Sequence, residues 1–235
     1  MNWLAGGRQM RHRCCVAAHR SPKASLAMIL YYALTACSIA PHIALEEIGV
    51  GFDPRPIDLA KGEQRSAEYL AINPRGRVPA MVIDDQVVTE VPALLTFIAG
   101  LAPDRELIPP NGTLAQARCF EWLGFLSSTL HVTYAQFRRP ERFLADDSPC
   151  AAELSREGCE RTVALYREVE QRLDGEWAAG DAYSIADMYL FPFYTWAWRI
   201  ELDVKRECPK WTAIFNRMLT RPAVRRAVER EGLQL

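Results

Sequence analysis

The sequence predicts a two-domain protein, with an N-terminal α/β domain followed by a C-terminal domain made only of helices. Residues 28–59 have the pattern of a strand, a helix and a second strand, and residues 80–101 that of a hairpin followed by a helix. Beyond residue 113 the apolar residues recur only at helical spacing. The predicted order is therefore βαβ, then ββα, in a domain at 28–107, with an all-helical domain at 114–235.

The first 27 residues differ from the rest in composition. They contain no acidic residue, and their five basic residues are Arg8, Arg11, Arg13, Arg20 and Lys23. The rest of the chain keeps 23 basic and 29 acidic residues, a formal charge of −6, which argues against a nucleic-acid footprint. The segment lacks the long apolar middle of a secretory signal and shows no amphipathic helix typical of a transit peptide. We expect a disordered leader, or an upstream start with the fold beginning near Met28.

Apolar runs and cysteines indicate the compartment. No run reaches about 18 uncharged apolar residues, so a membrane span is not expected. The seven cysteines lack Cys-x-x-Cys spacing, so no zinc or other metal site is expected. Without a secretory signal we expect a reducing, cytoplasmic compartment. We therefore expect the four cysteines after Cys37 to be small buried hydrophobic residues and not members of disulfides. They are Cys119, Cys150, Cys159 and Cys208.

The N-terminal domain begins with a short apolar run at 28–33, a polar break, and a helical pattern that ends at Gly49. Residues 52–59 alternate loosely and complete a right-handed βαβ unit of parallel strands. A looser segment at 61–72 follows. Residues 80–83 and 87–88 are rich in strand formers around a turn at 84–86, which predicts a hairpin before the helix at 90–101.

Proline, asparagine and glycine cluster at 103–112, as in a linker. Two apolar stripes at helical spacing follow and predict two long helices packed face to face. Their members are Phe120, Leu123, Ser127, Leu130, Tyr134 and Phe137, then Cys159, Thr162, Tyr166, Val169 and Leu173. Ser184 and Asp187 have the spacing of a capping box, which predicts a further helix after Ser184.

Cys37 is the first candidate for chemistry. It lies in the turn after the first strand, where Ser38 is placed to cap a helix with Pro41 in its first turn. A helix N-terminus favours an anion by about 0.3–1 kcal/mol. We therefore expect a stabilised thiolate, with a pKa lowered into the range of about 3.5–7.5. On position alone, a buried structural cysteine is the alternative.

A dithiol oxidoreductase needs a second cysteine three residues on, where this chain has Ala40. The thiol that reacts with Cys37 must therefore come from another molecule. A small thiol such as glutathione can supply it. Val78 and Pro79 open the third strand, and a cis bond there exposes the Val78 backbone to an extended peptide. The alternative is an ordinary turn proline. Glu90 begins the next helix, where it is placed to pair with the ammonium group of a glutamyl ligand.

His131 lies on the first long helix of the C-terminal domain, as a packing residue or as a polar group of the site. Aromatic residues near the next helix have two interpretations, first as core and second as an apolar substrate wall. They are Phe193, Tyr194, Trp196 and Trp198.

These segments together resemble the beta class of bacterial cytosolic glutathione transferases, and the likeness runs from about Met28 to Leu235. The matching segments are 31–42 (YYALTACSIAPH), 71–79 (AINPRGRVP), 89–90 (TE), 121–131 (EWLGFLSSTLH) and 184–191 (SIADMYLF). The resemblance implies a thioredoxin-like N-terminal domain, the glutathione transferase fold and a homodimer.

The resemblance also implies roles for site residues. Cys37 faces the glutathione sulfur and can form a mixed disulfide with it, and His131 reaches the sulfur from the second domain. Val78, before Pro79, pairs with the cysteinyl backbone, while Glu90 and the N–H of Val91 hold the γ-glutamyl end.

Two residues depart from the pattern of the family. Val91 stands where a hydroxyl residue is common, and Val132 stands where beta-class members often carry lysine, so weaker glutathione binding is expected. Lys61 is a candidate for the glycyl carboxylate.

The predicted function is a glutathione transferase of the detoxification type, which activates the glutathione thiol for attack on small apolar electrophiles. The electrophile pocket is predicted to be lined by Tyr32, Leu34, Tyr134, Phe137 and Trp196. Two alternatives stay open. One is a glutathione-dependent thiol transferase or reductase that uses Cys37, and the other is a non-catalytic binding or regulatory protein of the same fold.

Overall fold

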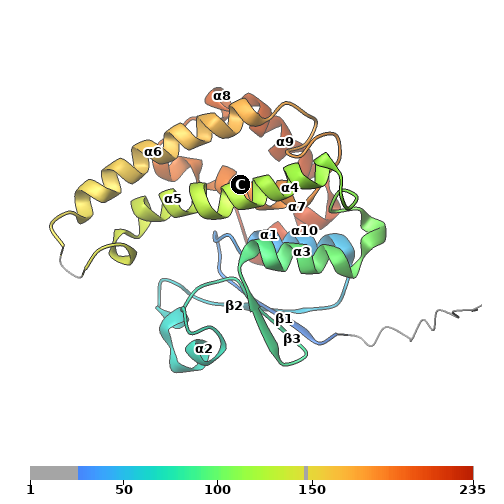
Figure 1. The fold of residues 1–235 in the computed structure, drawn as a ribbon. Helices are drawn as coiled ribbons and strands as arrows, with labels where there is room; N and C mark the ends of the chain where they lie inside the picture. Colours follow the sequence, from blue (N-terminus) through green and yellow to red (C-terminus); the bar gives the residue numbers. More distant parts are fainter. Residues whose placement is uncertain (1–25, 146–147, 235) are drawn as a thin grey trace, which may run out of the picture.

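The computed structural model describes residues 26–145 and 148–234, and its fold is that predicted, a mixed sheet with helices followed by a helical domain (Figure 1). Residues 1–25 of the predicted leader lie outside the described residues. Within the described ranges, no helix combines the length and apolar character that crossing a membrane requires.

In the part of the chain that the structure describes, four strands form one sheet in the order β2-β1-β3-β4. They are β1 (Met28–Tyr32), β2 (Asp53–Pro56), β3 (Ala80–Ile83) and β4 (Gln86–Thr89). β2 runs parallel to β1, whereas β3 is antiparallel to both β1 and β4. β2 is shorter than the predicted strand at 52–59. It is an edge strand in which Pro54 and Pro56 offer no N–H, so pairing beyond β1 is not available to it.

The predicted hairpin is confirmed, and its turn consists of Asp84 and Asp85, both at positive φ (44° and 68°). Two residues at positive φ match the twist of a tight hairpin, and aspartate is among the few residues that tolerate this conformation. β4 begins at Gln86, one residue earlier than predicted.

Three helices flank the sheet. α1 (Ile39–Ile48) and α3 (Val91–Leu101) lie between the sheet and the helical domain, and α2 (Ala67–Ile72) lies on the opposite side (Figure 1). α1 is buried almost throughout because it is covered from both sides. The segment at 61–72 holds a short turn, η1 (Glu63–Arg65), and α2, which Ser66 caps by accepting a hydrogen bond from the Tyr69 N–H at 3.2 Å.

The helical domain begins after η2 (Pro103–Arg105). Its first long helix is continuous through α4 (Leu114–Phe125), the π-helical turn η3 (Leu126–Leu130) and α5 (His131–Arg138). After η4 (Pro140–Arg142), the second long helix is α6 (Ala151–Arg172), which packs along α5. The two predicted long helices are thus confirmed. The remaining elements are α7 (Ile185–Trp196), η5 (Ala197–Ile200), α8 (Val204–Glu207), α9 (Pro209–Thr220) and α10 (Pro222–Glu231).

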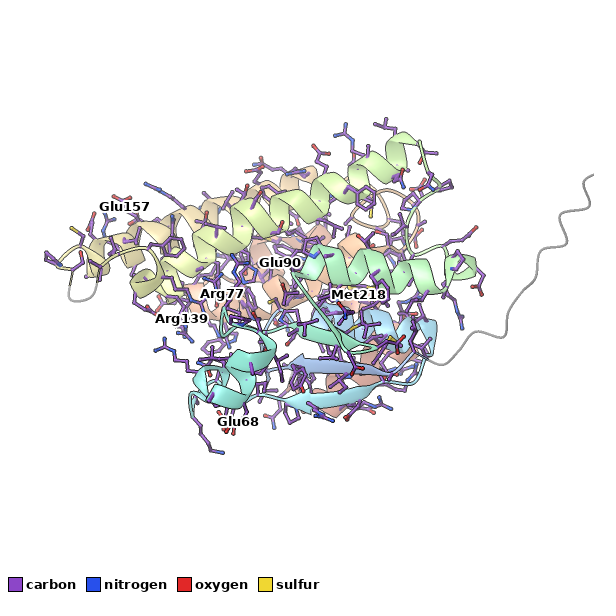
Figure 2. The ribbon with its side chains drawn as sticks, turned by 60° about the horizontal axis from the view of Figure 1, so that its bottom comes forward. Glu68, Arg77, Glu90, Arg139, Glu157 and Met218 are labelled. Atoms are coloured by element: carbon purple, nitrogen blue, oxygen red, sulfur yellow. The ribbon has the colours of Figure 1, made fainter. Side chains whose placement is uncertain are left out.

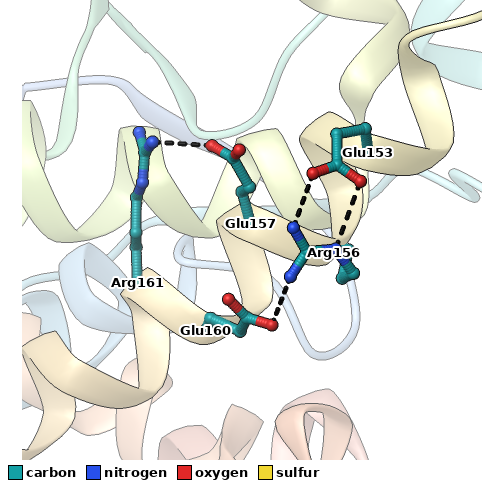
Figure 3. Close-up of polar contacts among 5 residues, drawn as sticks. All are labelled: Glu153, Arg156, Glu157, Glu160 and Arg161. Atoms are coloured by element: carbon teal, nitrogen blue, oxygen red, sulfur yellow. Dashed lines mark hydrogen bonds and ion pairs between the residues drawn. The ribbon is translucent and has the colours of Figure 1, made fainter.

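The outer face of α6 is covered with ion pairs (Figure 3). Arg156 pairs with Glu153 and Glu160, each at 2.5 Å, and Arg161 pairs with Glu157 at 2.6 Å. All are spaced three or four residues apart and exposed, so each pair adds only about 0.2–0.5 kcal/mol to the helix. This charged face lies away from the core.

α7 is the central helix of the core, because it packs against α1 and α3 of the first domain and α4 and α9 of the second. The predicted capping box at its start is confirmed: the Asp187 carboxylate accepts from the N–H groups of Ser184 and Ala178, each at 2.8 Å. One hydrophobic core therefore continues across both domains.

The described cysteines are all free thiols. Cys119 and Cys208 are buried, as predicted, and Cys159 is half-buried. The prediction is wrong for Cys150, which is exposed because it lies at the N-terminal end of α6, where the helix projects beyond the core.

Candidate active site

Cys37 lies in the turn between β1 and α1 and is buried. Its thiol donates a weak hydrogen bond to the Val78 carbonyl oxygen at 3.7 Å. Burial raises the pKa of Cys37 to about 12, and the negative charges of Glu90 and Glu231 add to this shift against the lowering effects of its own backbone N–H and of Arg142. This contradicts the predicted thiolate with a lowered pKa. Desolvation outweighs the helix N-terminus, and Cys37 is a neutral thiol.

Ser38 does not cap α1 with its side chain, contrary to the prediction. Its backbone is already helical (φ −61°, ψ −17°), whereas a capping serine is usually extended. The hydroxyl accepts from the Ala33 N–H at 3.1 Å and donates to the Ala33 carbonyl at 3.3 Å instead. Ser38 thus closes the cysteine turn, residues 33–38, onto the end of β1.

The cysteine turn is also held by the helical domain. Thr35 has a positive φ of 59°. Its carbonyl accepts from Trp196 Nε1 at 2.9 Å, and its hydroxyl accepts from Arg199 Nη2 at 2.9 Å. Neither contact was predicted from the sequence.

The Val78–Pro79 peptide bond is cis. The preceding Arg77 carbonyl accepts two hydrogen bonds of 2.7 Å, from the Tyr69 hydroxyl and from Asn73 Nδ2. The backbone that leads to Val78 is therefore held in place from α2 and its C-terminal end.

Glu90 immediately precedes α3, at a positive φ of 72°, and Val91 is the buried first residue of that helix. Glu90 already has a cationic neighbour, because its Oε1 lies 2.7 Å from Arg75 Nη1 in an exposed ion pair. Such a pair is worth about 0–1 kcal/mol, and a carboxylate accepts several donors, so Glu90 remains able to bind an ammonium group.

Lys61 is exposed, and its Nζ lies 3.1 Å from Asp58 Oδ2. The structure thus gives Lys61 a carboxylate partner within the same loop. A role toward a glycyl carboxylate stays a prediction.

His131 follows the π-helical turn, a feature that is frequent at functional sites. Its ring lies edge-on to Phe193, with centroids 5.4 Å apart, and 5.5 Å from Trp196, while Nδ1 is 3.4 Å from the Tyr189 hydroxyl. Burial lowers the pKa of His131 to about 4, with the positive charges of Arg142 and Arg77 contributing. His131 is therefore a neutral imidazole at pH 7.

Aromatic rings continue from His131 along the helical domain. Tyr134 stacks on Trp196 with centroids 4.7 Å apart and meets Phe137 edge-on at 6.1 Å. Leu34, in the cysteine turn, is 54% exposed. Tyr134 and Trp196 are buried in the core, and the role of these residues as an electrophile wall stays a prediction. Tyr32, also predicted to line the pocket, packs elsewhere. Its ring packs against His42 at 5.5 Å, on the side of the sheet that α1 covers, because successive strand residues face opposite sides.

Sequence reasoning missed the arginines around this site. Arg142 acts electrostatically on both Cys37 and His131, and Arg77 acts on His131. Figure 2 shows Arg77, Arg139 and Glu90 on the side where the sheet domain meets α5. The sequence gives no signal for these arginines, because they belong to no motif or periodic pattern and resemble ordinary surface residues.

The fold and the site define a two-domain protein with a thioredoxin-like domain, in which one cysteine lies in the turn before the first helix and the helical domain supplies a histidine. Residues 26–100 match the family model of the glutathione S-transferase N-terminal domain, and residues 141–222 match that of its C-terminal domain. The chain belongs to the glutathione S-transferase family.

Individual relatives agree. The chain is 32% identical to Glutathione S-transferase GstA of Escherichia coli O157:H7, over 88% of this chain and 100% of the relative. A glutathione transferase homolog from Sulfitobacter, solved with bound glutathione, has a TM-score of 0.82 and 34% identity, covering 88% of this chain and 99% of the other. A bacterial beta-class enzyme from Sphingomonas chungbukensis has a TM-score of 0.74 and 34% identity, covering 88% and 100%. The beta-class resemblance is thereby confirmed.

Proposed function

We propose that this protein is a glutathione transferase that binds glutathione on its domain at 28–107 and presents the thiolate to an electrophile held against the domain at 114–235. The observation that carries the proposal is the meeting of Cys37, the Val78 carbonyl and the His131 neighbourhood at one place. Cys37 Sγ lies 3.7 Å from the Val78 carbonyl oxygen. Trp196, whose ring centroid is 5.5 Å from that of His131, donates from Nε1 to the Thr35 carbonyl in the cysteine turn.

Glutathione is proposed to lie along the segment before β3, with its cysteinyl backbone paired to Val78. Its γ-glutamyl end reaches the start of α3, where the Glu90 carboxylate takes the ammonium group and the Val91 N–H takes the carboxylate. Lys61 is the candidate for the glycyl carboxylate. Relatives solved with glutathione support this proposal, among them the Sulfitobacter homolog.

The neutral state of Cys37 suggests what it does for a bound thiol. A protonated Cys37 donates a hydrogen bond, so it stabilises a glutathione thiolate beside it, as preorganised donors do in other active sites. Neutral His131 is a second polar neighbour of that sulfur, and Arg142 adds positive charge. The glutathione thiol releases its proton to solvent, its sulfur bonds to the electrophilic carbon, and the leaving group departs with the bonding pair.

Leu34, Tyr134, Phe137 and Trp196 are proposed to line the electrophile pocket. Leu34 of the cysteine turn is exposed, whereas Tyr134 and Trp196 are buried side chains that stack on each other next to His131. We further propose a cytoplasmic homodimer that needs no metal. Light scattering on a sizing column tests the dimer, for which twice the chain mass of 26.6 kDa is expected.

A second candidate, thiol transfer through Cys37, is favoured by the single sulfur at the place where glutathione is expected to lie. In that reaction the Cys37 sulfur attacks the glutathionyl sulfur of a mixed disulfide and releases the other thiol. The raised pKa of Cys37 weighs against it, because thiol exchange needs a thiolate.

Replacing Cys37 by serine separates these two functions. A serine keeps an O–H donor, so conjugation of chlorodinitrobenzene is expected to survive within about tenfold. If disulfide reduction disappears while conjugation survives, the Cys37 sulfur serves the reduction only. A loss of conjugation by several orders of magnitude contradicts the proposed role of Cys37.

The non-catalytic alternative is tested by ligand stabilisation. Millimolar glutathione raises the melting temperature of a protein that binds it, by an amount set by concentration over Kd. A shift accompanied by conjugation supports the transferase. A shift without turnover of any electrophile favours the binding protein.

A further inference from the structure

The His131 ring is held by one face of α7. Tyr189, Phe193 and Trp196 are spaced four and three residues apart, which places them in one row along that helix. The ring centroid of His131 lies 5.4 Å from that of Phe193 and 5.5 Å from that of Trp196. Its Nδ1 atom lies 3.4 Å from the Tyr189 hydroxyl oxygen. Within residues 26–145 and 148–234, this hydroxyl is the only hydrogen-bond partner of the ring.

The Tyr189 hydroxyl is a buried donor. The side chain is 2% exposed, and burial raises the pKa of Tyr189 well above its ordinary value of 10, so the phenol keeps its proton at pH 7. A buried hydroxyl whose proton has no acceptor costs free energy. In the described part of the chain, the acceptor that Tyr189 can reach is Nδ1 of His131.

This contact has two possible directions, and they leave different numbers of polar groups without a partner. If Tyr189 donates to Nδ1 of the neutral ring, the ring proton lies on Nε2, and the Nε2–H group alone lacks a protein partner. If Nδ1–H donates to the Tyr189 oxygen instead, both the tyrosine proton and the bare Nε2 lack one. The first direction therefore costs less. The lowered pKa of His131, about 4, excludes a ring protonated on both nitrogens at pH 7.

We propose that Tyr189 donates its hydrogen bond to Nδ1 of His131, which fixes the ring proton on Nε2 and makes Nε2–H a donor to the glutathione thiolate. The inference rests on the proposed glutathione transferase function and adds Tyr189 to it as a positioning residue that acts through His131. The His131 ring adjoins Trp196, whose Nε1 donates to the Thr35 carbonyl of the cysteine turn at 2.9 Å. With Nδ1 engaged by α7, Nε2 is the ring nitrogen left for the sulfur.

The fixed tautomer decides what His131 does in the reaction. A nitrogen that already carries a proton cannot remove the proton of the glutathione thiol, so His131 is not the base, and this proton goes to solvent. A hydrogen bond to the thiolate favours the charged form of the sulfur and lowers the pKa of the bound thiol. His131 therefore assists by donation, and Tyr189 keeps the donor on the correct nitrogen.

Nitrogen-15 NMR of the full chain, labelled at histidine, tests the tautomer without any turnover, because protonated and bare ring nitrogens resonate far apart. The chain has four histidines, and His131→Gln identifies the signals of His131. The expected result at pH 7 is a protonated Nε2 and a bare Nδ1. In Tyr189→Phe, which removes only the hydroxyl, both tautomers are expected. An Nδ1–H ring in the wild-type protein, or an unchanged tautomer in Tyr189→Phe, overturns the inference.

The pH dependence of conjugation tests the consequence. In Tyr189→Phe, kcat/KM for chlorodinitrobenzene should fall about fivefold at about pH 6.5, the scale of one hydrogen bond. At about pH 9 the loss should be less than about twofold, because a thiol with an ordinary pKa of about 8.5 ionises there without help. Tyr166→Phe is the control, since it removes another buried hydroxyl, which donates to the Phe193 carbonyl. Its ratio of the two rates should equal that of the wild type, and an equal loss at both pH values in Tyr189→Phe contradicts the inference.

Adding glutathione to the labelled protein separates this inference from the proposed function. The expected result is a shift of the Nε2 signal of His131 as its N–H bonds to the sulfur. If the protein conjugates chlorodinitrobenzene while glutathione leaves that signal unmoved, the donation is refuted and the proposed function stands. If glutathione neither moves the signal nor is conjugated, the proposed function fails and the donation with it, while the tautomer set by Tyr189 is still established by the spectra of the two variants.

Discussion

The indole Nε1 of Trp196 donates a hydrogen bond of 2.9 Å to the carbonyl oxygen of Thr35, which joins the end of α7 to the turn that carries Cys37. Thr35 has a φ of 59°, a conformation that few residues other than glycine adopt. Its hydroxyl makes a second contact, with Arg199. The helical domain therefore helps to hold the cysteine turn in a conformation that the turn by itself does not favour.

Replacing Trp196 by phenylalanine keeps an aromatic ring and removes the donor. We expect the free energy of unfolding to fall by about 1–3 kcal/mol, because the Thr35 carbonyl loses its partner and the smaller ring packs less well. KM for glutathione is expected to rise severalfold as the cysteine turn loosens. Urea unfolding and initial rates measure both. Trp198→Phe is the control, since Trp198 is 71% exposed, and equal behaviour of the two variants would refute the role of the contact.

The raised pKa of Cys37 predicts slow alkylation. With a pKa of about 12 and a buried sulfur, Cys37 has almost no thiolate at pH 7, so iodoacetamide should label the exposed Cys150 first. The rate at Cys37 should rise about tenfold per pH unit up to about pH 10 while the protein stays folded. Mass spectrometry of peptides after timed labelling gives both rates. Rapid labelling of Cys37 at pH 7 would show that the thiolate is stabilised after all.

The lowered pKa of His131 predicts that the protein loses stability at acidic pH. Its folded pKa of about 4 lies below the ordinary value of 6.5, so between these values the unfolded chain binds a proton that the folded protein does not. The free energy of unfolding therefore falls as the pH drops from about 6.5 to 4, by about 2 kcal/mol from this group. In His131→Gln that part of the loss is absent, as urea titrations at pH 7 and 4.5 should show. Equal acid sensitivity in both proteins would mean that His131 titrates normally.

The raised pKa of Asp187 predicts that stability changes with pH in the opposite direction. Burial raises its pKa to about 6 from 3.8, so its ionisation costs stability as the pH rises from about 4 to 6. Asp187→Asn removes this dependence and also one acceptor, because a single amide oxygen replaces two carboxylate oxygens that bind Ser184 and Ala178. At pH 7 the variant should lose about 1–3 kcal/mol in the free energy of unfolding. Asp181→Asn, in the exposed loop before α7, serves as the control and should change little.

The fold was predictable because its signals are local. The helical stripe through Leu123, Leu130 and Tyr134 predicts a long helix whatever surrounds it, and the pair of Asp84 and Asp85 predicts a tight turn. The segment at 61–72 was missed, because a helix of six residues is too short for a periodic pattern. Candidate site residues at the ends of elements, such as Cys37 and Glu90, were identified by position along the chain.

What the sequence by itself determined is the order of the elements and the side chains available to the site: one cysteine at the start of α1, the Val78–Pro79 pair before β3, and a histidine on the helical domain. Only the tertiary structure decided the protonation and the orientation of these side chains. Burial made Cys37 a thiol and His131 a neutral ring, and packing turned Tyr32 away from the site. The charge of Arg142, in η4 of the helical domain, acts on the pKa of Cys37 in the sheet domain. Desolvation and charge depend on neighbours in space, and residues far apart in the chain become neighbours only when it folds.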